Sequence, residues 1–353
     1  MSQKTRLGNF FEDFGIGQKI GHATPRTVTE GDVALYTALT GSRFACTSAD
    51  TFADRLGFPR SPVDDLLAFN MVFGKTVPDI SLNAVANLGY AAGRFGQPVY
   101  PGDTLSAEST VIGLKENRDG KTGVVYVRSR GVNQRAEMVL DYCRWVMVRK
   151  KDTAHPAPEA IVPELPAAVA ADDLIVPAGI RGDRYDCALA GSTDRWDDYR
   201  VGERIDHVDG MTIEESEHMM ATRLYQNTAR VHFNQHAEKD GRFGRRIVYG
   251  GFVISLARAL SFNGLANAFK IVAINGGRHV SPAFAGLTVY AWSEVLEKLV
   301  LPGRDDLGAL RLRTVATRDR ACADFPYKLD DGSYDPSVLL DFDYTVLMPR
   351  GSD

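Results

Sequence analysis

The sequence predicts an α+β protein made of two tandem copies of one domain, each with a central helix wrapped by a mainly antiparallel sheet. Three observations support this prediction. The two halves of the 353-residue chain repeat each other, each half has one long apolar helical stretch, and each has several segments of alternating polar and apolar residues. With 44% hydrophobic residues, the chain is long enough to form two packed domains.

The internal repeat holds over most of both halves. Asp13–Gly17 recurs as Asp198–Gly202, and His22 recurs as His207, each displaced by 185 positions (198 − 13 and 207 − 22). A register kept over this length indicates a tandem duplication, and two copies form two fused domains rather than a solenoid. After a one-residue slip, the offset becomes 184 and pairs Gly93 with Gly277, Pro98 with Pro282, Gly102 with Gly286 and Ser109 with Ser293.

The repeat and the proline content set the expected domain boundaries. We predict a first domain over residues 1–152, a linker over 153–185 and a second domain over 186–353. Residues 155–171 contain repeated prolines, which cannot donate hydrogen bonds to a helix or a sheet, so this stretch should run extended over the surface. Residues 323–337 form an extra loop, which explains the larger offset between the ends of the two copies.

Each copy is expected to begin with a strand and a capped helix. In the first copy, Thr29 and Asp32 have the spacing of a capping box before an apolar helix face. A longer apolar helix follows, predicted over 66–77 in the first copy and over 252–268 in the second. Strands with period-two alternation complete the first copy over 105–112, 123–128 and 138–147.

The composition excludes several classes of function. The net charge is −4 and the Lys and Arg residues are dispersed, so we expect neither nucleic acid nor membrane as a partner. The first residues lack the apolar core of a signal peptide, and the cysteines at 46, 143, 187 and 322 form no Cys-x-x-Cys pair. We therefore expect reduced, packed thiols, no metal site and a cytoplasmic location.

One short stretch carries the residue types of an acid–base site. Arg223–His236 contains Asn227 and His232, and the following segment ends in Gly250–Gly251, which opens an apolar helix. An imidazole titrates near neutral pH and is suited to act as a general base. A helix that starts on glycines offers unpaired N–H groups and the positive end of its dipole to an anion.

The spacing of these residues resembles the motif of the MaoC-like acyl-CoA hydratases. That motif places a histidine five residues after a Gly-Asp pair, and in the second copy Val231–His232 keeps the ending while Asn227 stands at the aspartate position (232 − 227 = 5). Ile247–Gly250 resembles the family's aliphatic-Val-His-Gly segment. The first copy keeps the opening of the motif in Tyr36–Gly41 but has Ser42 and Thr47 at the two catalytic positions.

This resemblance implies a double hotdog fold and a hydro-lyase. Thr228–His236 is most similar to hydratases of mesaconyl-CoA, which implies reversible conversion of mesaconyl-CoA, a branched and carboxylated enoyl-CoA, into β-methylmalyl-CoA. It implies His232 as the base, Gly250 as the donor to the thioester enolate, and no cofactor beyond the CoA of the substrate. In the first copy, Asp64–Asp65 would repel an oxyanion, so that copy is expected to accommodate acyl-CoA without catalysing its reaction.

Other candidate residues and readings stay open at this point. Tyr249 and Gly251 are expected to line the pocket, and the substrate carboxylate calls for an arginine, with Arg230, Arg278 and Arg43 as candidates beside Arg94. His236 and His279 are further candidates. Conversely, His232 could be a core histidine, Asn227 a structural residue and Gly250–Gly251 a tight turn. An acyl-CoA thioesterase, a non-catalytic acyl-CoA-binding module and a homo-oligomer are compatible with the same features.

Overall fold

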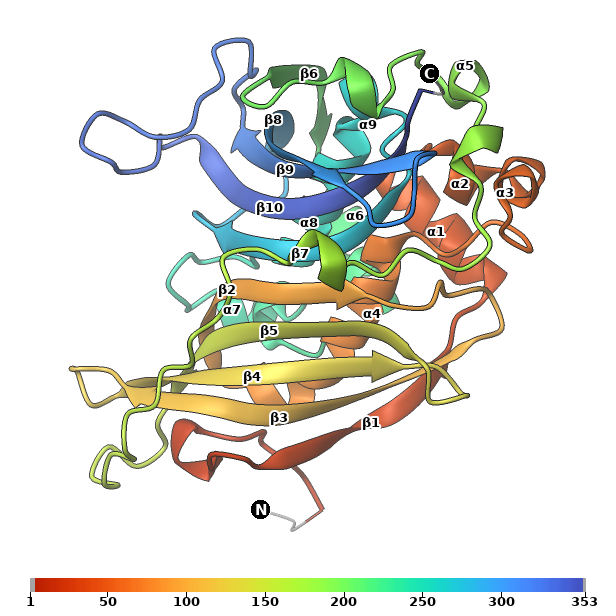
Figure 1. The fold of residues 1–353 in the computed structure, drawn as a ribbon. Helices are drawn as coiled ribbons and strands as arrows, with labels where there is room; N and C mark the ends of the chain where they lie inside the picture. Colours follow the sequence, from red (N-terminus) through yellow and green to blue (C-terminus); the bar gives the residue numbers. More distant parts are fainter. Residues whose placement is uncertain (1–3, 352–353) are drawn as a thin grey trace.

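The computed structural model describes residues 4–351, and within them ten strands form one antiparallel sheet that curves around two central helices (Figure 1). The strand order is β1-β3-β4-β5-β2-β7-β10-β9-β8-β6, so β2 and β7 join the two halves at the middle of the sheet. The strands are β1 (Lys19–Thr27), β2 (Ala84–Phe95), β3 (Thr104–Glu116), β4 (Thr122–Val132), β5 (Met138–Arg149), β6 (Arg204–Thr212), β7 (Lys270–His279), β8 (Thr288–Val300), β9 (Leu307–Arg318) and β10 (Val338–Pro349).

The predicted duplication is visible in contacts as well as in the order of elements. His22 Nε2 lies 2.7 Å from Ser109 Oγ, and His207 Nε2 lies 2.8 Å from Ser293 Oγ, so two residue pairs of the repeat make the same bond in each half. The central helices α4 (Asp65–Thr76) and α8 (Gly250–Leu260) meet where Asn70 Nδ2 donates to Ser255 Oγ at 3.2 Å.

The remaining helices lie around this central pair. The predicted capping box at Thr29 is present at the start of α1. These remaining helices are α1 (Glu30–Thr40), α2 (Ala45–Ser48), α3 (Asp50–Leu56), α5 (Cys187–Ala190), α6 (Glu215–Leu224), α7 (Gln235–Glu238) and α9 (Phe262–Leu265).

The helix predicted over 252–268 is shorter than expected. It ends at Leu260, and the chain turns at Asn263 and at Gly264, whose φ is +98°. The turn is fixed because Asn263 Nδ2 donates to the carbonyl of His207 and its own carbonyl accepts from His207 Nδ1. Apolar periodicity does not reveal such a break, since the residues on both sides of it are buried.

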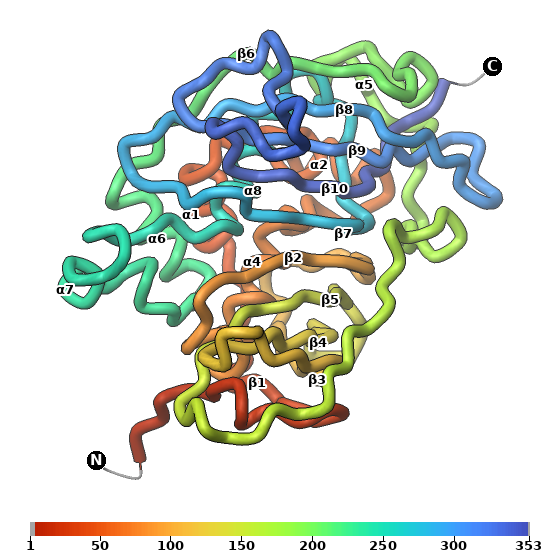
Figure 2. Tube along the Cα trace, turned by 90° about the vertical axis from the view of Figure 1, so that its left-hand side faces the viewer, coloured from red at the N-terminus to blue at the C-terminus, as the bar shows by residue number. Residues whose placement is uncertain are grey.

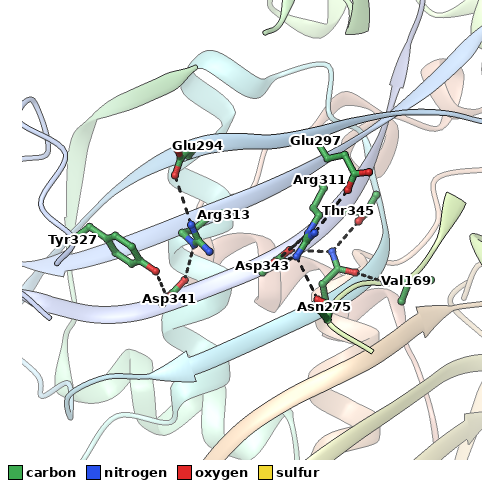
Figure 3. Close-up of polar contacts among 11 residues, drawn as sticks. Val169, Asn275, Glu294, Glu297, Arg311, Arg313, Tyr327, Asp341, Asp343 and Thr345 are labelled. Atoms are coloured by element: carbon green, nitrogen blue, oxygen red, sulfur yellow. Dashed lines mark hydrogen bonds and ion pairs between the residues drawn. The ribbon is translucent and has the colours of Figure 1, made fainter. Parts of the chain in front are cut away.

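Residues 153–173 pass over the outer face of the sheet, opposite α4 and α8 (Figures 1 and 2), and the chain then reaches α3, where the Arg181 N–H donates to the Leu56 carbonyl at 2.7 Å. A network of polar side chains on β7, β9 and β10 holds this segment (Figure 3). Asn275 accepts from the backbone N–H of Val169 at 2.9 Å and donates to Asp343 at 3.0 Å. Arg311 completes the network with a hydrogen bond of 2.7 Å to Asp343.

The four cysteines are buried and unpaired, as expected, and burial raises the pKa of each thiol. The loop 323–337 packs on the outer face of β8, where Trp292 Nε1 donates to the carbonyl of Pro326 at 3.0 Å. Across residues 4–351, every helix is too short or too polar to traverse a bilayer.

Candidate active site

The segment that carries Asn227 lies between α6 of the second copy and α4 of the first. Asn227 is 5% exposed, and its Oδ1 accepts from the N–H of Ala229 at 2.9 Å. A Cβ on Gly74 of α4 would lie 1.8 Å from the Tyr225 carbonyl oxygen and 3.4 Å from the Asn227 nitrogen. Because Gly74 has no side chain, this segment rests directly on the helix of the other domain.

His232 ends the short 3₁₀ helix η6 (Arg230–His232) and is half-buried. Its Nδ1–H donates to the carbonyl of Ile247 at 3.0 Å, which leaves Nε2 with a free lone pair. The pKa of His232 is lowered to about 4, mainly by burial and in addition by the nearby His218. The hydrogen bond to Ile247 acts in the opposite direction and raises this pKa. The imidazole is therefore neutral at pH 7 and able to take up a proton at Nε2.

Helix α8 begins at Gly250 and Gly251, directly after Tyr249. Within residues 4–351, no group accepts a hydrogen bond from the N–H of either glycine, and the Tyr249 side chain does not cap the helix. The ring of Tyr249 contacts His232, with centroids 5.6 Å apart. The two free donors and the positive end of the helix dipole therefore lie beside the imidazole.

A second histidine joins this group from the sheet. A Cβ on Gly250 would lie 2.4 Å from His279 Cε1, so the His279 ring packs directly on the start of α8. His279 Nε2 lies 3.2 Å from the hydroxyl of Tyr90, which comes from β2 of the first copy. Burial lowers the pKa of His279 to about 4, and the charge of His232 lowers it further. The two copies thus build the site together.

A cavity of about 510 Å³ adjoins the site on the Asn227 side. It lies between the C-terminal ends of α4 and α6 and includes Phe233, which follows His232 in the chain. His232, Tyr249, Gly250 and His279 do not line it. Its lining residues are Ala23, Thr24, Gly74, Lys75, Pro78, Met219, Thr222, Arg223, Gln226, Asn227, Thr228 and Phe233.

Comparison with known proteins agrees with this arrangement. A model of the mesaconyl-CoA hydratase family matches residues 2–324. The chain belongs to the mesaconyl-CoA hydratase family. It is 70% identical to the β-methylmalyl-CoA dehydratase of Chloroflexus aurantiacus, over 99% of both chains, and 61% identical to the mesaconyl-CoA hydratase of Cereibacter sphaeroides, over 98% of this chain and 100% of the relative.

Solved structures support the same assignment. A MaoC domain protein dehydratase from Chloroflexus aurantiacus superposes with a TM-score of 0.97 at 69% identity, covering 99% of this chain and 100% of its own. A Mycobacterium tuberculosis protein described as a double hotdog superposes with a TM-score of 0.76 at 22% identity, covering 97% of this chain and 99% of its own. The fold is therefore a MaoC-like double hotdog, as predicted.

The position in the first copy that corresponds to the family's active site is filled. Asp65 pairs with Lys270 at 2.5 Å, and Asp64 accepts from the N–H of Leu66 at 2.9 Å. The guanidinium of Arg258 lies 3.7 Å from the ring centroid of Phe44, and only about 10 Å³ of space remains. The expected room for acyl-CoA is not found at this degenerate motif, because side chains occupy it; the open space lies at the other end of α4.

The arginines expected to bind a carboxylate are not brought to His232. Arg230 is exposed at the start of η6. Arg278 is exposed and lies 5.7 Å from the Tyr334 ring on the outer face, because successive residues of a strand point to opposite faces and His279 takes the inner one. Arg43 is exposed and stacks 4.4 Å from Phe262, beside the filled site of the first copy.

Sequence reasoning gave little weight to His279 and none to Tyr90 or Lys75. The repeat held a signal for His279: at the offset of 184 its partner is Phe95 (279 − 184), an apolar residue. Lys75 carried a similar signal, since it stands in a helix that is otherwise almost uncharged, and its partner at the offset of 185 is Leu260. Where one copy has a polar residue and the equivalent position of the other copy has an apolar residue, the polar residue indicates a role specific to its own copy.

Proposed function

We propose that this protein catalyses the reversible addition of water to mesaconyl-CoA, which gives β-methylmalyl-CoA. Membership of the family and the names of the two relatives at 70% and 61% identity support this reaction. The observation that carries the site assignment is the hydrogen bond from His232 Nδ1 to Ile247, which leaves Nε2 as a base beside the free N–H groups of Gly250 and Gly251.

In the forward reaction, His232 Nε2 takes a proton from water while the water oxygen forms a bond to the β-carbon. The electron pair of the double bond moves toward the thioester oxygen, and the N–H groups of Gly250 and Gly251 stabilise the developing enolate. The protonated imidazole then returns the proton to the α-carbon. A histidine whose pKa is lowered to about 4 is a strong acid once protonated, which favours this second step.

Asn227 is suited to a substrate that carries its own charge. The free carboxylate of mesaconyl-CoA is attached to the β-carbon, where water adds. Since Asn227 Oδ1 is engaged by Ala229, its Nδ2 is the group available to hold water or substrate. A neutral donor avoids the repulsion that an aspartate would exert on a neighbouring carboxylate. The reaction needs water and no cofactor other than the CoA of the substrate.

A His232→Ala variant tests this proposal. We expect kcat for mesaconyl-CoA to fall about 10²- to 10⁴-fold, the usual contribution of a general base. His236→Ala is the matched control, because His236 lies four residues further on, is exposed, and should leave kcat unchanged.

The assay follows enoyl absorbance and free thiol together. Hydration removes the absorbance and leaves the thioester intact, whereas a thioesterase releases CoA thiol. Full activity in His232→Ala would overturn the site assignment, and stoichiometric thiol release by the wild type would overturn the reaction.

A further inference from the structure

Within residues 4–351, the cavity beside Asn227 is lined by a buried cation that forms no ion pair with a carboxylate. Lys75 lies in the last turn of α4 and is 3% exposed. Its Nζ donates to the carbonyl of Thr24, which also lines the cavity. Within residues 4–351, no carboxylate lies within 4.0 Å of this ammonium group. A buried charge without a partner is costly to maintain, so its retention calls for an explanation.

The other buried lysines of the described chain do have carboxylate partners. Lys150 Nζ lies 2.6 Å from Glu116, and Lys270 Nζ lies 2.5 Å from Asp65. Lys75 is therefore as buried as these two lysines but, among the described residues, lacks the carboxylate partner that each of them has. In the duplicate, the corresponding position is Leu260, which has no charge. The unpaired lysine is thus a feature of one copy and not a requirement of the fold.

The surroundings of Lys75 favour an anion. No aspartate or glutamate lines the cavity, and Arg223 adds a second positive charge at an exposed position. Burial lowers the pKa of Lys75 to about 8, and the charge of Arg26 lowers it further. The ammonium group is therefore still mostly protonated at pH 7, and a bound anion would raise its pKa.

We propose that Lys75 binds the free carboxylate of the acyl group and thereby makes the site selective for a carboxylated enoyl-CoA. This inference rests on the proposed function and names a residue for its specificity. Lys75 and Asn227 line the same cavity, so a carboxylate held by Lys75 lies on the side of the site where Asn227 can hold water. A volume of about 510 Å³ is large enough for a branched four-carbon acyl chain with its carboxylate.

Binding of two saturated, unreactive analogues tests the role of Lys75 without any need for turnover. One is 2-methylsuccinyl-CoA, which has the free carboxylate, and the other is 2-methylbutyryl-CoA, which lacks it. For Lys75→Met, calorimetry should show at least about a tenfold rise in Kd for the carboxylated analogue and little change for the uncharged one. Lys75→Arg should restore most of the affinity, because it keeps the charge.

Lys150→Met is the matched control, since it removes a buried lysine that does not line the cavity and should leave the ratio of the two Kd values unchanged. An equal loss of affinity for both analogues would assign Lys75 to the CoA phosphates or to the fold, and would overturn the proposal. Equal binding of both analogues by the wild type would also overturn it. If the wild type binds the carboxylated analogue selectively but hydrates no enoyl-CoA, the proposed reaction is refuted while the role of Lys75 in binding stands.

The pH profile supplies a further readout. The preference for the carboxylated analogue needs protonated Lys75, so it should decline as pH rises through about 8 in the wild type. In Lys75→Arg the decline should disappear, because a guanidinium stays charged well above this pH. A preference that does not change between pH 7 and pH 9.5 in the wild type would contradict the assignment.

Discussion

At the scale of single residues, the most informative side chains are those whose polar atoms are buried for no structural reason. Asn227 is mostly buried: its Oδ1 accepts from the Ala229 N–H, while its Nδ2 lies beside the cavity and is open to a ligand or water. Tyr249 and Tyr225 have buried hydroxyl groups that have no hydrogen-bond partner in residues 4–351. Such groups are expensive in a folded core, and they concentrate here around the start of α8.

Asn227→Asp separates the two interpretations of this residue. The new carboxylate keeps the bond to Ala229 but adds a negative charge next to the site of the substrate carboxylate. We expect kcat/KM for mesaconyl-CoA to fall at least about tenfold and that for crotonyl-CoA to fall less. Steady-state kinetics on both substrates measures the difference. Equal losses would indicate that Asn227 serves the fold only.

At the scale of elements, the two central helices differ at their N-termini. Within residues 4–351, helix α8 starts on two glycines whose N–H groups have no acceptor, whereas α4 starts on Asp65, whose carboxylate is paired with Lys270. We therefore propose that the start of α8 stabilises the developing enolate, while the start of α4 is held by an ion pair. Helix α4 contributes at its opposite end, through Gly74 and Lys75.

Gly74→Ala tests the contact between α4 and the segment that carries Asn227. Its Cβ would lie 1.8 Å from the Tyr225 carbonyl oxygen, so the segment must move away from the helix. We expect the free energy of unfolding to fall by about 1–3 kcal/mol. We also expect kcat/KM to fall by more than the smaller fraction of folded protein would cause. Gly15→Ala is the control, because a Cβ there meets nothing within 4 Å. Wild-type kinetics in Gly74→Ala would contradict this view of the site.

At the scale of the whole molecule, the linker and the sheet form one unit. Asn275 joins the backbone of Val169 to Asp343 and Thr345 on β10, with donor–acceptor distances of 2.9 to 3.0 Å (Figure 3). The same network includes Arg311, which also donates to the carbonyl of Ala167. The extended segment is thus held on the outer face, although its prolines form no regular structure.

Asn275→Ala should loosen the linker. It leaves the Val169 N–H and the Asp343 carboxylate short of a partner, so we expect thermal unfolding at lower temperature and faster proteolytic cleavage within residues 155–171. Arg313→Met removes a neighbouring ion pair to Asp341 that does not reach the linker, and its cleavage rate should match the wild type. Equal cleavage in all three proteins would show that the network does not hold this segment.

Three histidines with lowered pKa values determine how stability depends on pH. Desolvation in the fold lowers the pKa of His207, His232 and His279 to about 4, below the ordinary value of 6.5. Between these values the unfolded chain binds more protons than the folded one, so the histidines stabilise the fold above pH 6.5 and lose that contribution as pH falls toward 4. The free energy of unfolding should therefore decrease from pH 6.5 to pH 4. A flat profile across this interval would contradict the burial of these imidazoles as neutral groups.

The sequence alone determined the duplication and the α+β class, and it predicted the joint use of His232 and Gly250, which stays a prediction. These follow from short-range spacing and from the repeat, and both are local properties of the chain. The repeat also predicted long-range structure correctly, since His22 bonds Ser109 just as His207 bonds Ser293. Where the two copies share a residue pattern, a contact found in one copy predicts the same contact in the other.

The tertiary structure decided which polar groups meet across the two domains. Tyr90 and His279 are 189 positions apart, and Lys75 and Asn227 are 152 apart (227 − 75), yet each pair lies at one site. It also placed Arg278 on the outer face and, among residues 4–351, gave Lys75 no carboxylate within 4.0 Å, and spacing along the chain specifies neither. Burial and charge pairing depend on all the elements packed around a residue, and for that reason they emerge only when the sheet closes around both helices.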